Sequence, residues 1–424
     1  MSTTADTTAI EVVAVIVIVV VKVAIVICVC SKRNQVSSGS VIPDTQFITL
    51  TMDKFLNDME REKPIRFTGQ QLRIATDNYS NLLGSGGFGT VYKGIFSNGT
   101  LVAVKVTLVA VKVLRGSSNK KIDEQFMAEV GTIGRIHHFN LVRLYGFCFE
   151  RNLIALVYEY MGNGSLDRYL FHEKKALEYE KLHEIAIGTA RGIAYLHEEC
   201  QHRIIHYDIK PGNILLDKNF YPKVADFGLA KLCNRENTHI TMTGGRGTPG
   251  YAAPELWMPF PITHKCDVYS FGMLLFEIIG RRRNLEIKNS ESQEWFPIWV
   301  WKKFDAGLLG EAMIVCGIEE KNREIAERMV MVALWCVQYR PELRPIMSVV
   351  VKMLEGSLEI PKTLNPFQHL FDGTNFVTQS GQVSNTYTTT VTSSTSSVMV
   401  SDSSIVCATP IMRKYEIELA SSIV

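Results

Sequence analysis

The sequence predicts an α+β protein with a small β-rich lobe and a larger helical lobe, preceded by a transmembrane helix. Three observations lead to this prediction. Strand-like patterns punctuated by glycine begin at about Tyr79, helical periodicities follow them as far as about Leu354, and a strongly apolar run covers residues 12–30. Strands followed by helices indicate two packed lobes, one of each kind.

The apolar run at residues 12–30 is interrupted only by Lys22. At 1.5 Å per residue its helix is long enough to cross a hydrocarbon core. Lys32 and Arg33 follow it directly, so the positive-inside rule leaves the C-terminal body in the cytoplasm. The alternative is a buried valine-rich strand pair. Residues 1–11 would form a short extracellular N-terminus, too short to fold as a ligand-binding domain.

The remaining chain divides by composition into three parts. Residues 31–78 are polar and mixed and predict a juxtamembrane linker. Residues 79–357 carry the strand and helix patterns and predict one folded domain. Residues 358–424 turn to Ser and Thr runs, which bury little, and predict a disordered tail.

Charge and cysteine content exclude some classes of partner. The 424 residues include 45 Lys and Arg against 43 Asp and Glu, a formal net charge of +2. No polybasic face indicates nucleic acid, so small-molecule and protein partners are expected. The cysteines show no CxxC pair, which favours reduced thiols in a cytosolic body.

The segment "LGSGGFGTVYKG" places Gly84, Gly86 and Gly89 at G-x-G-x-x-G spacing, with Val91 two residues later. A dinucleotide-binding turn would open into a helix, whereas "TVYKGIF" alternates like a strand and ends at the hairpin signal "SNGT". The glycines are therefore predicted to lie between two strands, where backbone N–H groups can approach phosphates.

Three further motifs follow in a fixed order. "IIHYDIKPGNILL" contains Asp208, Lys210 and Asn213, "ADFGLA" contains Asp226, and "TPGYAAPE" contains Glu255. With the Gly-rich loop and "VAVK", this order resembles that of the eukaryotic protein kinases and covers about two thirds of the chain. "FNLVRLYGFC", "GIAYLHEEC" and "DVYSFGMLLFEII" resemble plant receptor-like kinases, in particular the leaf-rust-resistance receptor-like branch.

The resemblance implies a bilobal kinase fold that binds ATP and Mg²⁺. Asp208 would accept the proton of the substrate hydroxyl, and Lys210 would steady the transferring phosphate in the serine/threonine pattern. Asn213 and Asp226 are oxygen ligands suited to Mg²⁺.

The resemblance also implies a nucleotide site in the small lobe. Glu129 lies on an amphipathic helix, positioned to reach a strand lysine. Tyr158 resembles a gatekeeper, and Glu159 to Met161 would offer backbone groups to adenine. Outside this site, Asp267 and Arg344 are expected to be structural, the arginine pairing with Glu255.

The strand with the lysine is duplicated. Residues 101–114 read "LVAVKVTLVAVKVL", with Ala103 and Lys105 in the first copy and Lys112 in the second. In one unbroken strand the two lysines would point to opposite faces, because they are seven residues apart and side chains alternate. One copy is therefore predicted to be looped out.

Two signals disagree on which copy of the repeat pairs with the preceding strand. An Asn98-Gly99 turn would place Phe96 opposite Leu101 and bring the first copy into the sheet, which favours Lys105. The distance to Glu129 favours the second copy. Hairpin register is the stiffer constraint, so the prediction is Lys105.

Tyr207 stands where most kinases have an arginine before the catalytic aspartate. That arginine normally pairs with a phosphorylated activation loop, so phosphate at Thr238, Thr241 or Thr243 would lack its counter-charge. Activation by loop phosphorylation is therefore not expected.

The leading interpretation is a single-pass plasma-membrane serine/threonine kinase with a cytoplasmic catalytic domain, acting on proteins in receptor-like or defence signalling, with a possible co-receptor. The alternative is a pseudokinase or scaffold whose nucleotide site is damaged by the repeat. A third reading is that the repeat and the missing ectodomain are errors of the gene model.

Overall fold

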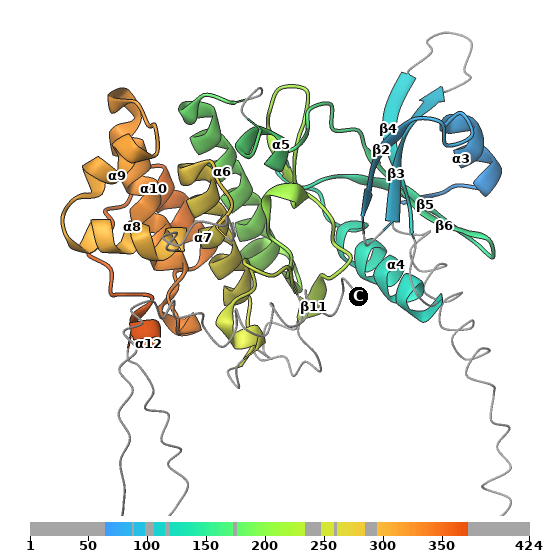
Figure 1. The fold of residues 1–424 in the computed structure, drawn as a ribbon. Coiled ribbons are helices and arrows are strands. Elements are labelled where there is room, and N and C mark those ends of the chain that lie inside the picture. The colour runs from blue at the N-terminus through green and yellow to red at the C-terminus, as the bar shows by residue number, and fades with distance from the viewer. Residues whose placement is uncertain are drawn as a thin grey trace, which may run out of the picture. The chain divides into compact units, whose positions relative to one another are not determined.

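The computed structural model describes residues 64–86, 89–97, 106–114, 119–172, 176–233, 247–257, 261–284 and 295–371. Within these ranges a β-sheet with one long helix precedes a mainly helical part, as Figure 1 shows. The predicted order of a β-rich lobe and a helical lobe is therefore confirmed.

The small lobe is a six-stranded sheet in the order β1-β5-β6-β4-β3-β2. Its elements are β1 (Ile65–Arg66), α3 (Gly69–Ala75), β2 (Leu82–Gly86), β3 (Gly89–Ser97), β4 (Val106–Val113), α4 (Asn119–Ile133), β5 (Leu144–Glu150) and β6 (Leu153–Glu159). Alternate residues of β4, among them Val109 and Val111, point into a core with Leu72, Cys148 and Val157. The other face of β4 is thereby turned toward the site described below.

The register of β3 and β4 differs from the predicted one. Phe96 lies opposite Thr107 and Val91 lies opposite Lys112. The prediction that Phe96 would lie opposite Leu101 is therefore wrong, and the second copy of the repeat forms the strand. Residues 98–105, which hold most of the first copy, lie outside the described residues.

Side-chain alternation explains this outcome. In the predicted register Tyr92 would face Lys105, and residues opposite each other on paired strands share a face of the sheet. Val91 lines the cavity, so its neighbour Tyr92 points to the opposite face. A two-residue turn would therefore have directed the lysine of the first copy away from the cavity.

The predicted linker at residues 31–78 is partly folded. β1 pairs in parallel with β5, and the N-cap of α3 is Thr68, whose side chain forms a reciprocal capping box with Gln71. Leu72 of α3 is fully buried in the core of the sheet. A two-residue strand has no periodicity to detect, but Thr68 and Gln71 are a readable helix-start signal.

The large lobe surrounds helix α7 (Lys265–Gly280). Its other elements are β7 (Gly164–Ser165), α5 (Asp167–Leu170), α6 (Tyr179–Ala194), β8 (Arg203–Ile205), β9 (Ile214–Leu216), β10 (Pro222–Val224), β11 (Lys231–Cys233), α8 (Phe296–Asp305), α9 (Leu309–Val315), α10 (Arg323–Cys336), α11 (Met347–Leu354) and α12 (Gln368–Phe371). Every residue of α7 from Cys266 to Ile279 is buried. A helix that is buried on all sides forms the centre of a core, and α7 is therefore the fixed frame for the loops that pack on it.

Two buried charges of the large lobe behave as predicted. Arg344 donates to both carboxylate oxygens of Glu255 at 2.6 and 2.8 Å, with both side chains fully buried. The predicted pair is confirmed. Asp267 of α7 accepts hydrogen bonds from the backbone N–H groups of His206 and Tyr207, each at 2.8 Å. It thereby anchors the start of residues 206–213, called the catalytic segment below because they hold the predicted catalytic residues.

Residues 358–371, the first part of the predicted tail at 358–424, are described and pack on the large lobe. Gln338 donates to Thr363 Oγ1 at 3.0 Å, Phe367 is buried, and α12 reaches Phe371. The residues after 371 lie outside the described ranges.

Among the described residues, no helix combines the length and apolar character needed to cross a membrane. The span predicted at residues 12–30 lies outside them.

Glu277 of α7 is a buried acid with consequences for stability. It accepts from the Tyr251 hydroxyl at 2.6 Å and from Asn284 N–H at 3.0 Å. Burial outweighs these bonds and raises the pKa of Glu277 from 4.5 to about 7. A raised acid pKa means that the folded state retains a proton that the unfolded state releases, so stability falls as pH rises between about 4.5 and 7.

We expect Glu277→Gln to remove this pH dependence. The free energy of unfolding of the wild type, relative to the variant, should fall by up to about 3 kcal/mol as pH rises through that window. Subtracting the unfolding free energy of the variant from that of the wild type cancels the contributions of other titrating groups. One of these is His264, whose burial lowers its pKa to about 3. Chemical denaturation at several pH values measures it, and parallel curves would contradict the expectation.

Candidate active site

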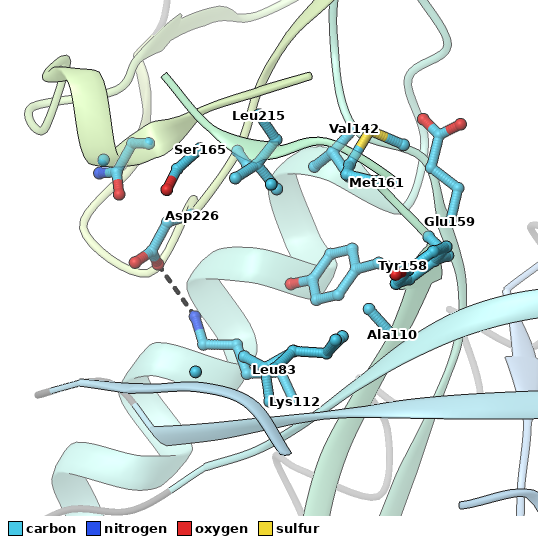
Figure 2. Close-up of a pocket in the computed structure, with 18 of the residues that line it drawn as sticks. Leu83, Ala110, Lys112, Val142, Tyr158, Glu159, Met161, Ser165, Leu215 and Asp226 are labelled. Atoms are coloured by element: carbon cyan, nitrogen blue, oxygen red, sulfur yellow. Dashed lines mark hydrogen bonds and ion pairs between the residues drawn. The ribbon is translucent and has the colours of Figure 1, made fainter. Parts of the chain in front are cut away.

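A cavity of about 410 Å³ lies between the sheet and the loops of the large lobe (Figure 2). This volume is in the range of small-molecule sites. The described lining residues are Leu83, Gly84, Ser85, Val91, Ala110, Lys112, Glu129, Val142, Tyr158, Glu159, Tyr160, Met161, Gly162, Gly164, Ser165, Arg168, Gly212, Asn213, Leu215, Ala225 and Asp226.

Lys112 joins the two lobes at the inner end of the cavity. Its Nζ lies 2.6 Å from Glu129 Oε1 of α4 and 2.9 Å from Asp226 Oδ1. Figure 2 shows its side chain extending from β4 toward Asp226. The lysine of the second copy therefore occupies the position expected of the working one, and the preference for Lys105, which lies outside the described residues, is not supported.

In this cluster the effect of burial on each pKa is opposed by the neighbouring opposite charges. Burial acts to lower the pKa of Lys112, but Glu129 and Asp226 raise it above its ordinary value. Burial acts to raise the pKa of Asp226, but the Lys112 ammonium outweighs it, and the pKa of Asp226 falls below its usual value. The site therefore contains a buried cation and an ionised carboxylate that is still partly exposed to the cavity.

Tyr158 closes the back of the cavity. It lies on β6, and its hydroxyl donates to Glu129 Oε2. The carboxylate of Glu129 is thus held from two sides, by Tyr158 and by Lys112. This fixes α4 against the sheet in the position that the lysine requires.

The opposite end of the cavity is apolar and is bounded by the segment after β6. Glu159 and Met161 line it as expected, together with Ala110, the second-copy counterpart of Ala103. Ala103 lies outside the described residues. Leu215 and Val142 complete this apolar end, and both were missed from the sequence because single apolar residues carry no motif.

The glycine loop forms the turn between β2 and β3. Gly84 lines the cavity, and Gly86 pairs with Gly89. A Cβ on Gly89, whose φ is +139°, would lie 2.2 Å from Val113 O. No side chain is therefore tolerated at this position. A Cβ at Gly84 or Gly86 would meet nothing within 4 Å, consistent with backbone that is open to a ligand.

The catalytic segment holds Asp208 through three donors. Asp208 Oδ2 accepts from Lys210 Nζ and from Asn213 Nδ2, each at 2.8 Å, and Oδ1 accepts from the Thr248 hydroxyl at 2.5 Å. Lys210 also donates to Thr248 Oγ1 at 2.7 Å. A carboxylate has about four acceptor positions, so Oδ1 retains one for an incoming hydroxyl.

Thr248 was not predicted from the sequence. It lies 40 residues after Asp208, just before the "GYAAPE" segment whose acid Glu255 was singled out. A Thr-Pro-Gly turn signals a tight bend but not the partner of its hydroxyl. The backbone turn in which Tyr251 N donates to Thr248 O at 3.1 Å sets its position.

A family model for protein tyrosine and serine/threonine kinases matches residues 78–354, which include all of these groups. The chain belongs to this kinase family. The motif order read from the sequence thus identified the family correctly.

Within this family, the relatives that the chain matches are plant receptor-like serine/threonine kinases. A G-type lectin S-receptor-like serine/threonine-protein kinase of Arabidopsis thaliana is 48% identical over 301 residues, covering 70% of this chain and 33% of the relative. Rust resistance kinase Lr10 of Triticum aestivum is 43% identical over 320 residues (74% and 49%), and a leaf rust 10 disease-resistance locus receptor-like kinase of Arabidopsis is 43% identical over 299 (69% and 46%). The chain spans a third to a half of the length of these relatives.

Proposed function

We propose that this chain is an active serine/threonine kinase that transfers the γ-phosphate of ATP to protein hydroxyl groups. The observation that supports it most is the assembled site, in which Lys112 is paired across the lobes and Asp208 keeps an acceptor position free. Phosphoryl transfer depends on positioning and charge neutralisation more than on covalent chemistry.

Asp208 would orient the substrate hydroxyl and accept its proton as the oxygen attacks phosphorus. Lys210, 2.8 Å from Asp208 and 2.7 Å from Thr248, would stabilise the developing negative charge. Lys112 would hold the nucleotide phosphates. Glu129 keeps that lysine in place, and Tyr158 keeps Glu129 in place.

Kinases of this family use ATP with a divalent metal, and the residues present fit Mg²⁺. Asp226 is ionised, and Asn213 donates its amide nitrogen to Asp208, which leaves its amide oxygen for a cation. Two oxygen donors suit Mg²⁺, which keeps several ligands for water and phosphate. The bound ion would neutralise phosphate charge.

The pseudokinase alternative rested on the repeated strand. β4 nevertheless forms a continuous ladder with β3 and β6, and its lysine reaches both acids. No contact among the described residues favours a damaged nucleotide site.

The membrane part of the proposal rests on the apolar run at 12–30 and on the receptor-like names of the relatives. We propose one span with the kinase domain in the cytoplasm of a plasma membrane, with a co-receptor as a further partner. Retention in the membrane pellet after an alkaline wash would support the span, and release would reject it.

The experiment for the activity uses the full chain with labelled ATP and matched Ser, Thr and Tyr peptides. Labelling of Ser and Thr peptides that is lost on chelation of divalent metal is the expected result. Transfer to none of the peptides, by a protein shown to be folded, would reject the proposal.

Loop phosphorylation is expected to have little influence. Tyr207, which replaces the usual arginine, is 2% exposed and offers no cation. Replacing Thr238, Thr241 and Thr243 together with Ala should lower activity only modestly; these threonines lie outside the described residues. Initial rates of peptide phosphorylation measure this. A collapse that acidic substitutes restore would show that another basic group pairs with a loop phosphate.

A further inference from the structure

One charged residue of the cavity has no counter-ion among the residues that the structure describes. Among the described lining residues five side chains are charged, and four of them are paired: Lys112 with Glu129 and Asp226, and Glu159 with Lys223 at 3.4 Å. The fifth is Arg168 of α5, which is exposed and forms no ion pair within the described part of the chain.

Arg168 lies at the mouth of the cavity beside the catalytic segment. A Cβ on Gly164, whose φ is +69°, would lie 2.9 Å from Arg168 Nη1, so the guanidinium packs against glycine backbone. Gly212 and Asn213, which line the cavity with it, belong to the segment that holds Asp208. An acceptor hydroxyl reaching Asp208 therefore brings its flanking residues near this cation.

A second exposed arginine packs on the residue that lies about one helical turn after Arg168. The Arg283 guanidinium lies 4.5 Å from the centre of the Phe171 ring, and Phe171 follows Arg168 by three residues, about one helical turn. Arg283 is also exposed and without an ion pair among the described residues.

Two acids, Glu277 and Asp167, form no ion pair with these cations within the described residues, although the charge of Arg283 acts to lower the pKa of Glu277. Glu277 is 2% exposed, and both its oxygens accept hydrogen bonds. Asp167 is partly exposed, but its Oδ1 is buried. Two other residues that line the cavity add no charge: Ser165 is neutral, and Gly212 has only open space where a side chain would project.

We propose that Arg168, supported by Arg283, selects protein substrates that carry an anionic side chain close to the accepting Ser or Thr. A guanidinium without a counter-ion binds carboxylate and phosphate groups through paired N–H donors. The anion can be Asp, Glu or a residue phosphorylated earlier. This inference rests on the proposed kinase activity and names the substrate class for the same site.

The test compares peptide substrates with the full chain. Glu, Gln, Lys or phosphoserine is placed at each position flanking one acceptor Ser, and kcat/KM is measured. The wild type should prefer Glu or phosphoserine over Gln at one or two positions, by about two- to fivefold for an exposed ion pair. The preference should shrink as ionic strength rises.

Three variants of Arg168 and one control variant test whether Arg168 causes this preference. Arg168→Gln should lose it, Arg168→Glu should reverse it toward Lys, and Arg168→Lys should keep part of it. Arg151→Gln, an exposed arginine in the turn between β5 and β6, is the matched control and should retain it. Circular dichroism confirms folding of each variant.

Other results overturn the inference. A wild type that phosphorylates all peptides equally, or an Arg168→Gln variant that keeps the preference, rejects the role in substrate selection. A rise in the KM for ATP with unchanged peptide preference assigns Arg168 to the nucleotide instead. A folded wild type without any phosphate transfer rejects the kinase activity itself, and this inference with it.

Discussion

Replacing Lys112 with Met is expected to lower phosphate transfer by about 10²- to 10³-fold, whereas replacing Lys105 with Met leaves it close to that of the wild type. Lys112 is the cation that contacts both Glu129 and Asp226 in the cavity. Methionine keeps most of the side-chain volume but leaves the phosphates without their cation. Steady-state rates with a Ser peptide measure both variants.

The same substitution should also affect folding, and the control must separate the two effects. Breaking a buried pair by removing one partner costs about 3–5 kcal/mol; Lys112 is 9% exposed at its side chain, but Asp226 retains 25%, so a smaller cost is expected. Rates are therefore compared at a temperature where both variants are folded. Loss of activity in Lys105→Met alone would return the role to the first copy, and two active variants would mean that the copies exchange.

Deletions must be designed around the repeat. Removing residues 107–113 leaves the same sequence as removing 101–107, because the two copies are identical. In that deletion Asn98-Gly99 would close the register that turns the lysine away from the cavity, so activity should fall, and the result cannot tell the copies apart. Removing residues 100–105 can, because it retains the Ser97–Val106 pair and closes it with Asn98-Gly99, a favoured two-residue turn.

The wrong prediction of the β3–β4 register shows which information a turn sequence lacks. Asn98-Gly99 favours a two-residue turn whatever strand follows it, and both copies offer the same side chains. The choice is made by distant pairing: Val109 lies opposite Glu159 and Val113 opposite Ala155 on β6, which places Lys112 within reach of α4. No window of sequence around the turn contains that information.

Other parts of the site could be predicted from the sequence, because their residues belong to motifs with a fixed order and spacing. The glycine loop, Asp208, Asn213 and Asp226 follow one another at spacings that few other proteins share, so the fold class and family followed from the sequence. Thr248 and Arg168 were not found, since a hydroxyl and a surface arginine acquire meaning only from what lies beside them in space.

Replacing Asp208 with Asn is expected to lower turnover by about 10³-fold with little loss of stability. Asn has the same shape, and its amide can still accept from Lys210 or Thr248 on one side. It has no carboxylate oxygen to accept the proton of the attacking hydroxyl. The loss should therefore appear in kcat, with the KM for ATP nearly unchanged.

Thr248 provides the matched test of how Asp208 is held. Its hydroxyl donates to Asp208 Oδ1 at 2.5 Å and accepts from Lys210 at 2.7 Å, so it links the base to the cation. Thr248→Ser keeps this hydroxyl and should retain most activity, whereas Thr248→Val keeps the shape and should lose about tenfold or more, the value of one charge-assisted hydrogen bond. In an Asp208→Asn background the Val substitution should add little, because groups that act as a unit are not additive. Full turnover in Asp208→Asn, or a further tenfold loss on adding Val, would show that the base lies elsewhere or that Thr248 acts independently of it.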